Sequence, residues 1–292
     1  MSLRHASGVT RPPALVALAA IAGFCAGACG GTGSPIGPAA QPKPTIEVRT
    51  LNVQGSDRSY RLVRPPAPGV SKPLPLLLVL HGAGSTAEEA AVTTGFDSVS
   101  VQEQVIVVYP NADNGRWHAT GSRNVDDVLF IRTLIDRLEA DYQIDPARIY
   151  ATGFSNGAEM TYRLACQLAD RIAAVGPVAG TNGTTDCHPA HPISVISFHG
   201  TTDSNSRYQG DPGIGVLSFP AEFERWQQLD GCSSSPKVED SSPLVIRSSA
   251  NCQAGTAVTF YTLVEGDHEW PRSATVSATK LIWQFFATKA RN

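Results

Sequence analysis

Short, nearly continuous apolar runs recur along this chain and indicate its architecture. Two early segments, 45–53 and 59–64, alternate apolar and polar residues, which predicts an antiparallel hairpin. The runs that follow are apolar at almost every position, a pattern typical of strands buried on both faces. These runs are residues 75–80, 105–110, 148–154, 173–180 and 193–200.

Helical patterns separate several of these runs. The clearest spans 126–141, where apolar residues recur every three or four positions and Asp126 or Asp127 can cap the first turn. Strands that alternate with helices predict an α/β fold with a mostly parallel, doubly wound sheet flanked by helices. In such a sheet, functional groups gather at the carboxyl ends of the strands.

The first 44 residues have a different character. Arg4 and Arg11 precede an apolar run that is short for a membrane span, so residues 1–28 are predicted to be an export signal. Residues 26–29, Ala-Gly-Ala-Cys, resemble a bacterial lipobox, in which Cys29 would carry a lipid anchor. Ordinary secretion is the main alternative, and a cytosolic chain with an apolar start is the other.

Domain organisation follows from the same change in composition. Residues 29–44 are rich in Gly, Pro and Ala, which predicts a tether, and 45–292 is predicted to be a single domain.

The net charge of −3 gives no case for nucleic-acid binding or for attraction to an anionic membrane surface. Contact with a membrane is therefore expected only through the lipid anchor, at the cell surface; without the anchor the protein would be extracellular.

Removal of the signal would take Cys25 with it, and besides Cys29 four cysteines would remain, all in the body of the chain. They are Cys166, Cys187, Cys232 and Cys252. An even number in an exported chain predicts two disulfides, for which three pairings exist. The sequential pairing is favoured, because each bond then closes a loop of about twenty residues.

A metal site is the alternative use of one of these cysteines. Cys187, His188 and His191 lie close together in the sequence, but a zinc site needs a fourth ligand. No second paired motif supplies it. The chain is therefore expected to need no metal or other cofactor.

Residues 153–157, Gly-Phe-Ser-Asn-Gly, match the pattern G-x-S-x-G. The match follows a predicted buried strand and precedes a helical segment, which is the context of a nucleophile elbow. Ser155 is therefore the candidate nucleophile, and Gly153 and Gly157 would leave space for a strained turn. A Gly/Ser turn without a catalytic role is the alternative.

A serine nucleophile needs a base and an orienting acid, and in this kind of sheet they follow it in the order acid, then histidine. His268 is the last histidine of the chain and follows a strand-like segment, so it is the predicted base rather than an exposed loop histidine. Asp203 comes three residues after a buried run and is the preferred acid. Asp211 and Asp267 are the competing acids.

The oxyanion of an acyl-transfer intermediate needs two backbone N–H groups. Asn156, directly after the candidate nucleophile, is predicted to supply one. The loop 81–84, His-Gly-Ala-Gly, follows an apolar run, and Ala83 is predicted to supply the other, with Gly82 as the fallback. His81 is expected to hold this loop by hydrogen bonds rather than to react.

Three aromatic residues lie near these loops in the sequence. They are Trp117, Tyr208 and Trp270. Each is a candidate for a substrate-binding wall, and a packed loop anchor is the alternative for each.

Taken together, the motifs resemble those of the secreted serine esterases grouped with polyhydroxybutyrate depolymerases, feruloyl esterases and acetylxylan esterases. The matching motifs are HG-x-G at 81–84, YP-x-A with a downstream Trp at 109–117, DD-V-x-F-I at 126–131, DP-x-R-[IV]-Y-x-x-G-x-S-N-G at 145–157, HGT-x-D at 199–203 and H-x-WP at 268–271. The resemblance covers about residues 75–285 and implies an α/β-hydrolase fold. The family's nucleophile, acid and base fall on Ser155, Asp203 and His268.

Three positions depart from the family pattern. Ala158 and Asp267 stand where the family often has glycine, and residues 206–208, Ser-Arg-Tyr, replace a frequent Val-Pro-Tyr. None of these changes removes a catalytic atom.

The resemblance implies a serine carboxylic ester hydrolase that works through an acyl-enzyme. The expected substrates are feruloyl, acetyl or hydroxyalkanoate esters, carried by a polysaccharide or a polyester oligomer. An acyltransferase of the cell envelope and a non-catalytic carbohydrate-binding or interaction protein are the alternatives.

Overall fold

The computed structural model describes residues 43–66, 72–120, 126–184 and 186–291. The chain divides by its internal contacts into Met1–Gln41 and Pro42–Asn292, and every element below lies in the second unit. The predicted signal at 1–28, the lipobox Cys29 and nearly all of the predicted tether lie outside the described residues. Within the described ranges, no helix has both the length and the apolar character needed to cross a bilayer.

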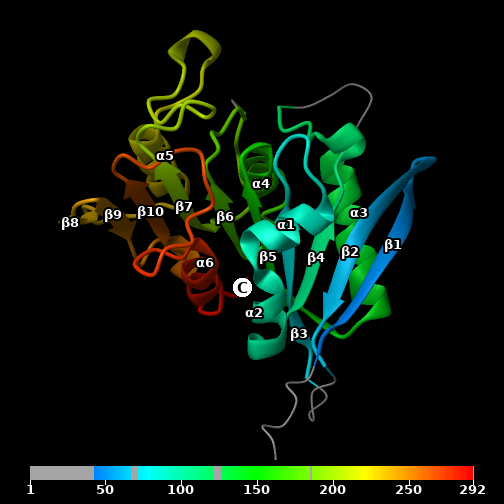
Figure 1. Ribbon diagram of the computed structural model, residues 1–292. Coiled ribbons are helices and arrows are strands. Elements are labelled where there is room, and N and C mark those ends of the chain that lie inside the picture. Colours follow the sequence, from blue (N-terminus) through cyan, green and yellow to red (C-terminus); the bar gives the residue numbers. More distant parts are fainter. Residues whose placement is uncertain (1–42, 67–71, 121–125, 185, 292) are drawn as a thin grey trace, which may run out of the picture. The chain divides into compact units, whose positions relative to one another are not determined.

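A single sheet forms the middle layer of the unit (Figure 1). Within the described residues it has ten strands in the order β1-β2-β4-β3-β5-β6-β7-β10-β9-β8. The strands are β1 Thr45–Val53, β2 Ser56–Arg64, β3 Leu74–Leu80, β4 Ile106–Pro110, β5 Ile144–Phe154, β6 Ala174–Val178, β7 Ser194–Gly200, β8 Lys237–Ser241, β9 Leu244–Ser249 and β10 Val258–Leu263. Neighbours from β4 to β10 are parallel, and antiparallel strands flank both edges.

This topology confirms the predicted mostly parallel sheet. The predicted hairpin is β1–β2, whose register pairs Thr45 with Arg64 and Val53 with Ser56. Each of the predicted buried runs is a strand of the parallel part, from β3 to β7. Because these strands are covered on both faces, nearly every position in them must be apolar.

Helices cover both faces of the sheet (Figure 1). They are α1 Ala87–Thr94, α2 Phe96–Glu103, α3 Asp127–Asp141, α4 Asn156–Gln167, α5 Phe219–Leu229 and α6 Ala278–Phe286, with short 3-10 turns at Asp113–Gly115, Pro212–Ile214 and Gln253–Gly255. Side chains of β3 alternate between two cores: Leu76, Leu78 and Leu80 share one with α3, α4 and α5. Leu77 and Val79 share the other with α1, α2 and α6.

Helix α3 has the predicted bounds and cap. Asp126 is its N-cap, and its carboxylate accepts a hydrogen bond from the Leu129 N–H at 3.0 Å. Asp127, the other candidate cap, instead lies buried and accepts a hydrogen bond from Arg58 at 2.7 Å. The buried face of α3 is Phe130, Ile131, Leu134, Ile135 and Leu138.

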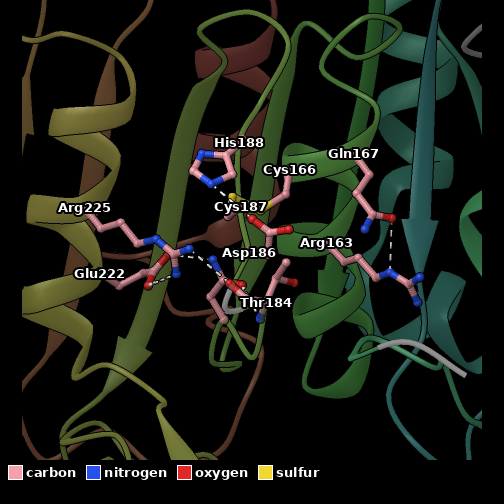
Figure 2. The surroundings of a disulfide bond; sticks show 10 residues. Arg163, Cys166, Gln167, Thr184, Asp186, Cys187, His188, Glu222 and Arg225 are labelled. Atoms are coloured by element: carbon pink, nitrogen blue, oxygen red, sulfur yellow. Dashed lines mark hydrogen bonds and ion pairs between the residues drawn. A yellow bond between two sulfur atoms is a disulfide. The ribbon is translucent and has the colours of Figure 1, made fainter.

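Two disulfides fasten segments outside the sheet. Cys166, near the end of α4, is bonded to Cys187 in the segment that follows β6 (Figure 2). Cys232, just beyond α5, is bonded to Cys252 before β10. The predicted sequential pairing is confirmed, and Cys187 is therefore not a thiolate available to a metal.

Candidate active site

Ser155 occupies the turn between β5 and α4, and its backbone is strained. Its φ is 56° and its ψ is −121°, a conformation that non-glycine residues rarely adopt. A Cβ on Gly153 would lie 2.4 Å from the Gly157 carbonyl oxygen, and a Cβ on Gly157 would lie 2.4 Å from that of Leu80. The two glycines therefore allow β3, β5 and α4 to approach closely enough to hold Ser155 in this turn.

Ala158, which departs from the family pattern, fills a defined space in α4. Its side chain is fully buried. A Cβ on Gly180, in the segment after β6, would lie only 2.6 Å from the Ala158 Cβ. The methyl group at 158 therefore occupies room that exists because residue 180 has no side chain.

Asp203 and His268 reach Ser155 from two other strand ends. Asp203 follows β7, and His268 follows β10, the strand that pairs with β7 in parallel. His268 Nδ1 lies 2.8 Å from Asp203 Oδ2, and His268 Nε2 lies 2.9 Å from Ser155 Oγ. The three residues selected by chain order thus form one hydrogen-bonded line.

The surroundings of Asp203 favour its ionised form. Burial alone would raise the pKa of this carboxyl group, but hydrogen bonds from His199, His268 and the Ser206 N–H lower the pKa to about 2. An ionised carboxylate can only accept hydrogen bonds, so the proton between it and His268 lies on Nδ1. His268 Nε2 is then free to accept the proton of the Ser155 hydroxyl.

The competing acids have other roles. The Asp267 carboxylate accepts a hydrogen bond from the His268 backbone N–H at 2.8 Å, so it shapes the loop that carries the imidazole. The Asp211 carboxylate accepts one from the Gly213 N–H at 3.0 Å and caps a 3-10 turn. Neither carboxylate is the hydrogen-bond partner of the His268 ring.

The loop after β3 runs beside Ser155. A Cβ on Gly82 would lie 3.5 Å from the Ser155 Cβ. Within the described part of the chain, the N–H groups of Ala83 and Asn156 have no hydrogen-bond acceptor. These two donors are therefore available to an oxygen atom bound next to Ser155.

His81 holds this loop through both ring nitrogens. Its Nε2 accepts a hydrogen bond from the Ala112 N–H at 3.0 Å, which leaves the proton on Nδ1 to donate to the Gly82 carbonyl at 2.7 Å. Burial lowers the pKa of His81, so the ring stays neutral. A neutral ring with both nitrogens engaged orders the backbone, as the sequence predicts.

A cavity of about 360 Å³ opens in front of Ser155 and His268. One part of its wall is formed by the backbone and side chains of the nucleophile elbow and of the loop after β3, including Phe154 and Ala83. Residues of α1 form another part of the wall. The lining is Leu80, His81, Gly82, Ala83, Ser85, Ala90, Thr93, Thr94, Phe154, Ser155, Asn205 and His268, which includes no carboxylate, ammonium or guanidinium group.

The three aromatic substrate-binding candidates are not among the residues that line this cavity. Trp117, Tyr208 and Trp270 have exposed fractions of 1%, 8% and 4%. The Tyr208 hydroxyl lies 3.0 Å from Thr262 Oγ1, and the Trp270 indole N–H donates to Thr279 Oγ1 at 3.0 Å. They are packed loop anchors, because each polar atom has its partner inside the protein.

The residues that do form the α1 wall carried no signal in the sequence. Ala90, Thr93 and Thr94 are small and belong to no recognisable motif. The capping box that starts α1, with Thr86 and Glu89 bonded reciprocally, was the available clue to a helix at this position.

Comparison with known proteins is consistent with this geometry. Residues 58–221 match the family model described as esterase PHB depolymerase. The protein designated esterase NocK of Nocardia uniformis subsp. tsuyamanensis is 29% identical over 93% of this chain and 94% of its own length. Feruloyl esterase B of Piromyces equi is 30% identical over 68% of this chain and 40% of its own length. The chain thus spans nearly all of the first relative and less than half of the second.

Solved structures share the fold at low sequence identity. The acetyl xylan esterase from Aspergillus awamori superposes with a TM-score of 0.62 at 14% identity, covering 82% of this chain and 99% of that one. The ferulic acid esterase from Anaeromyces mucronatus superposes with a TM-score of 0.53 at 17% identity, covering 87% of this chain and 93% of that one. The predicted α/β-hydrolase fold is confirmed.

Proposed function

The chain belongs to the esterase PHB depolymerase family and is a carboxylic ester hydrolase, and we propose that Ser155, Asp203 and His268 are its catalytic triad. The observation that carries this proposal is the line of hydrogen bonds from Asp203 through His268 to Ser155, with distances of 2.8 and 2.9 Å. The strained turn at Ser155 and the low pKa of Asp203, about 2, support the same roles.

The proposed reaction has two halves. Ser155 Oγ attacks the ester carbonyl carbon while His268 Nε2 takes the hydroxyl proton, and the alcohol then leaves with that proton. Water next attacks the acyl-enzyme, again losing a proton to His268, and the carboxylic acid is released with Ser155 restored. Asp203 holds the imidazole in the required tautomer and stabilises the imidazolium that forms in each half.

The proposed oxyanion hole consists of the Ala83 and Asn156 N–H groups. Both donors lack an acceptor among the described residues, and Ala83 lines the cavity. Asn156 is also the first residue of α4, where the helix dipole favours negative charge. Donors fixed before the reaction stabilise the developing oxyanion without reorganisation during it.

We propose that the substrate presents an uncharged acyl group. The cavity beside Ser155 has about 360 Å³ and a lining without carboxylates or basic side chains, which suits acetyl, feruloyl or hydroxyalkanoate groups. Two relatives support esters attached to polysaccharide as the substrate. One is named feruloyl esterase B, and the other is named bifunctional acetylxylan esterase/xylanase.

Export is proposed on two observations. The apolar segment after Arg4 and Arg11 has the length and setting of a signal sequence. Both disulfides would be unusual in a reducing cytosol. Lipid attachment at Cys29 would then keep the esterase at the cell surface.

Replacement of the nucleophile tests the triad. Ser155→Ala is expected to lower kcat on p-nitrophenyl acetate on the order of a million-fold, because the acyl-enzyme cannot form. The circular dichroism spectrum should be unchanged, and labelling by a fluorophosphonate probe should be lost. Ser85→Ala, which removes another hydroxyl from the cavity lining, is the matched control and should label normally. Substantial hydrolysis by Ser155→Ala would refute the proposal.

A further inference from the structure

Trp117 joins the two backbone segments that carry the proposed oxyanion donors. Its indole N–H donates to the His81 carbonyl at 3.0 Å, one residue before Gly82 and two before Ala83. Its backbone N–H donates to Asn156 Oδ1 at 2.7 Å, and its carbonyl accepts from Asn156 Nδ2 at 3.1 Å. One residue is therefore bonded to the loop after β3 on one side and to the start of α4 on the other.

These bonds lie away from solvent. Trp117, His81 and Asn156 are exposed by 1%, 2% and 5%. Since water cannot replace a broken bond there, loss of one partner leaves a buried polar group unsatisfied. The connection is therefore stiff, and it is completed by the His81 ring, which accepts the Ala112 N–H from the same segment, residues 111–118.

Segment 111–118 is itself anchored at both ends by charged side chains. The buried Asp127 accepts hydrogen bonds from the His118 backbone N–H at 2.8 Å and from Arg58 at 2.7 Å. Arg58 also donates to the Asn111 carbonyl at 3.2 Å, and Arg163 of α4 donates to the His118 carbonyl. Charge-assisted bonds of this kind are stronger than neutral ones, so both ends of the segment have fixed positions.

From this arrangement we infer that Trp117 and the side chain of Asn156 are positioning residues that fix the separation of the Ala83 and Asn156 N–H groups. The inference rests on the proposed function, because it assigns these N–H groups to the oxyanion. Both side chains are buried and neither is among the residues that line the cavity, so we assign them a positioning role and no contact with substrate. Their contribution appears where the oxyanion forms, in the transition state, and not in binding of the neutral ester.

Two variants break the connection at different points and leave both oxyanion N–H groups in the chain. Trp117→Phe keeps an aromatic ring and removes the indole N–H, and Asn156→Ala keeps the backbone N–H. Each is expected to lower kcat on p-nitrophenyl acetate about tenfold, with KM changed less than about twofold. The inhibition constant of phenylboronic acid, which forms a tetrahedral adduct on a serine nucleophile, should rise by about the same factor. Titration with the fluorophosphonate gives the concentration of reactive active sites, so that kcat is calculated for folded enzyme alone.

Trp283→Phe is the matched control. Trp283 is a buried indole on α6 whose N–H has no partner among the described residues, so the same substitution there removes no hydrogen bond. Its kcat and its inhibition constant for phenylboronic acid should equal those of the parent enzyme. The double variant Trp117→Phe/Asn156→Ala should lose little more than the worse single variant, because both substitutions break the same connection.

Three results would overturn the inference. One is that both single variants have a lower melting temperature but the same kcat per active site and the same inhibition constant for phenylboronic acid as the parent enzyme. Another is a loss expressed in KM alone. The third is full additivity in the double variant. Each of these results can be distinguished from failure of the proposed function, because in that case the Ser155→Ala variant would still hydrolyse the ester.

Discussion

Two carboxylates in this protein differ in their ionisation although both side chains are shielded from solvent. Asp203, in the candidate active site, and Asp230, at the end of α5, both have side chains removed from solvent. The pKa of Asp203 is lowered to about 2, whereas burial raises the pKa of Asp230 to about 7. Burial therefore does not by itself decide the charge of a carboxyl group.

The difference lies in the donors that face each group. Asp203 Oδ1 accepts from the N–H groups of Asn205 and Ser206, and its Oδ2 faces the His268 and His199 rings. Asp230 Oδ1 accepts the Ile193 N–H at 2.9 Å, and the Thr256 hydroxyl also lowers its pKa, but among the described residues no hydrogen bond reaches Oδ2. A carboxylate stays ionised when enough donors replace its lost water.

Asp203→Asn would test the active-site half of this comparison and should have the largest effect. An amide at this position removes the negative charge and favours the wrong His268 tautomer, so kcat should fall about ten-thousand-fold. Steady-state hydrolysis of p-nitrophenyl acetate measures this fall in kcat. A loss below about tenfold would show that the ionised carboxylate is not required. Asp267→Asn, in the same loop as His268, is the control and should retain most activity.

Asp230→Asn would test the other half through stability. Asp230 has a pKa of about 7 in the folded chain and an ordinary value of 3.8, so the folded state binds the extra proton between these values. Stability should therefore fall as pH rises from about 4 to about 7. Asparagine removes this dependence and should raise the free energy of unfolding at about pH 8 by up to about 4 kcal/mol.

Urea unfolding of parent and variant across this pH range measures the difference. The two proteins should converge near pH 4, where the parent carboxyl group is protonated in the folded state. A constant difference at every pH would contradict the assigned pKa, and equal kcat values would confirm that this carboxylate takes no part in catalysis.

Removal of the neighbouring disulfide should have the smallest effect of the three. Cys232 lies two residues after Asp230, and its bond to Cys252 closes a loop of 20 residues. The double replacement Cys232→Ser/Cys252→Ser should lower the free energy of unfolding by about 3 kcal/mol, through the unfolded chain, and leave kcat unchanged. Differential scanning calorimetry measures the loss, and a parallel fall in kcat would mean that this corner of the fold supports the active site.

The parts of the fold that follow from the sequence are those where burial restricts residue type. The parallel strands are covered on both faces, so their apolar runs stand out, and Gly153 and Gly157 are needed wherever backbone packs this closely. Chain order singled out His268 as the candidate base. Hairpin β8–β9 was not predicted, because β8 is fully exposed and has no alternation of apolar residues.

Side-chain direction is the main thing that the motifs did not reveal. Trp117 belongs to a recognisable motif near the active site, but a motif does not say whether a ring faces the cavity or the protein. The α1 wall was missed because Thr93 and its neighbours on α1 are small and common residues. The raised pKa of Asp230 comes from burial that its hydrogen-bond donors offset only in part, which no local pattern records.

The two parts of the cavity wall differ in how well they would tolerate substitution. On the elbow side, a side chain added at Gly153 or Gly157 would collide with backbone at 2.4 Å and disturb the turn that holds Ser155. The α1 side presents only methyl and hydroxyl groups, from Ala90, Thr93 and Thr94, none of which holds the triad. Exchange of a few residues on one helical turn of α1 is therefore expected to change the acyl preference of this protein while leaving the Ser155–His268 contact in place.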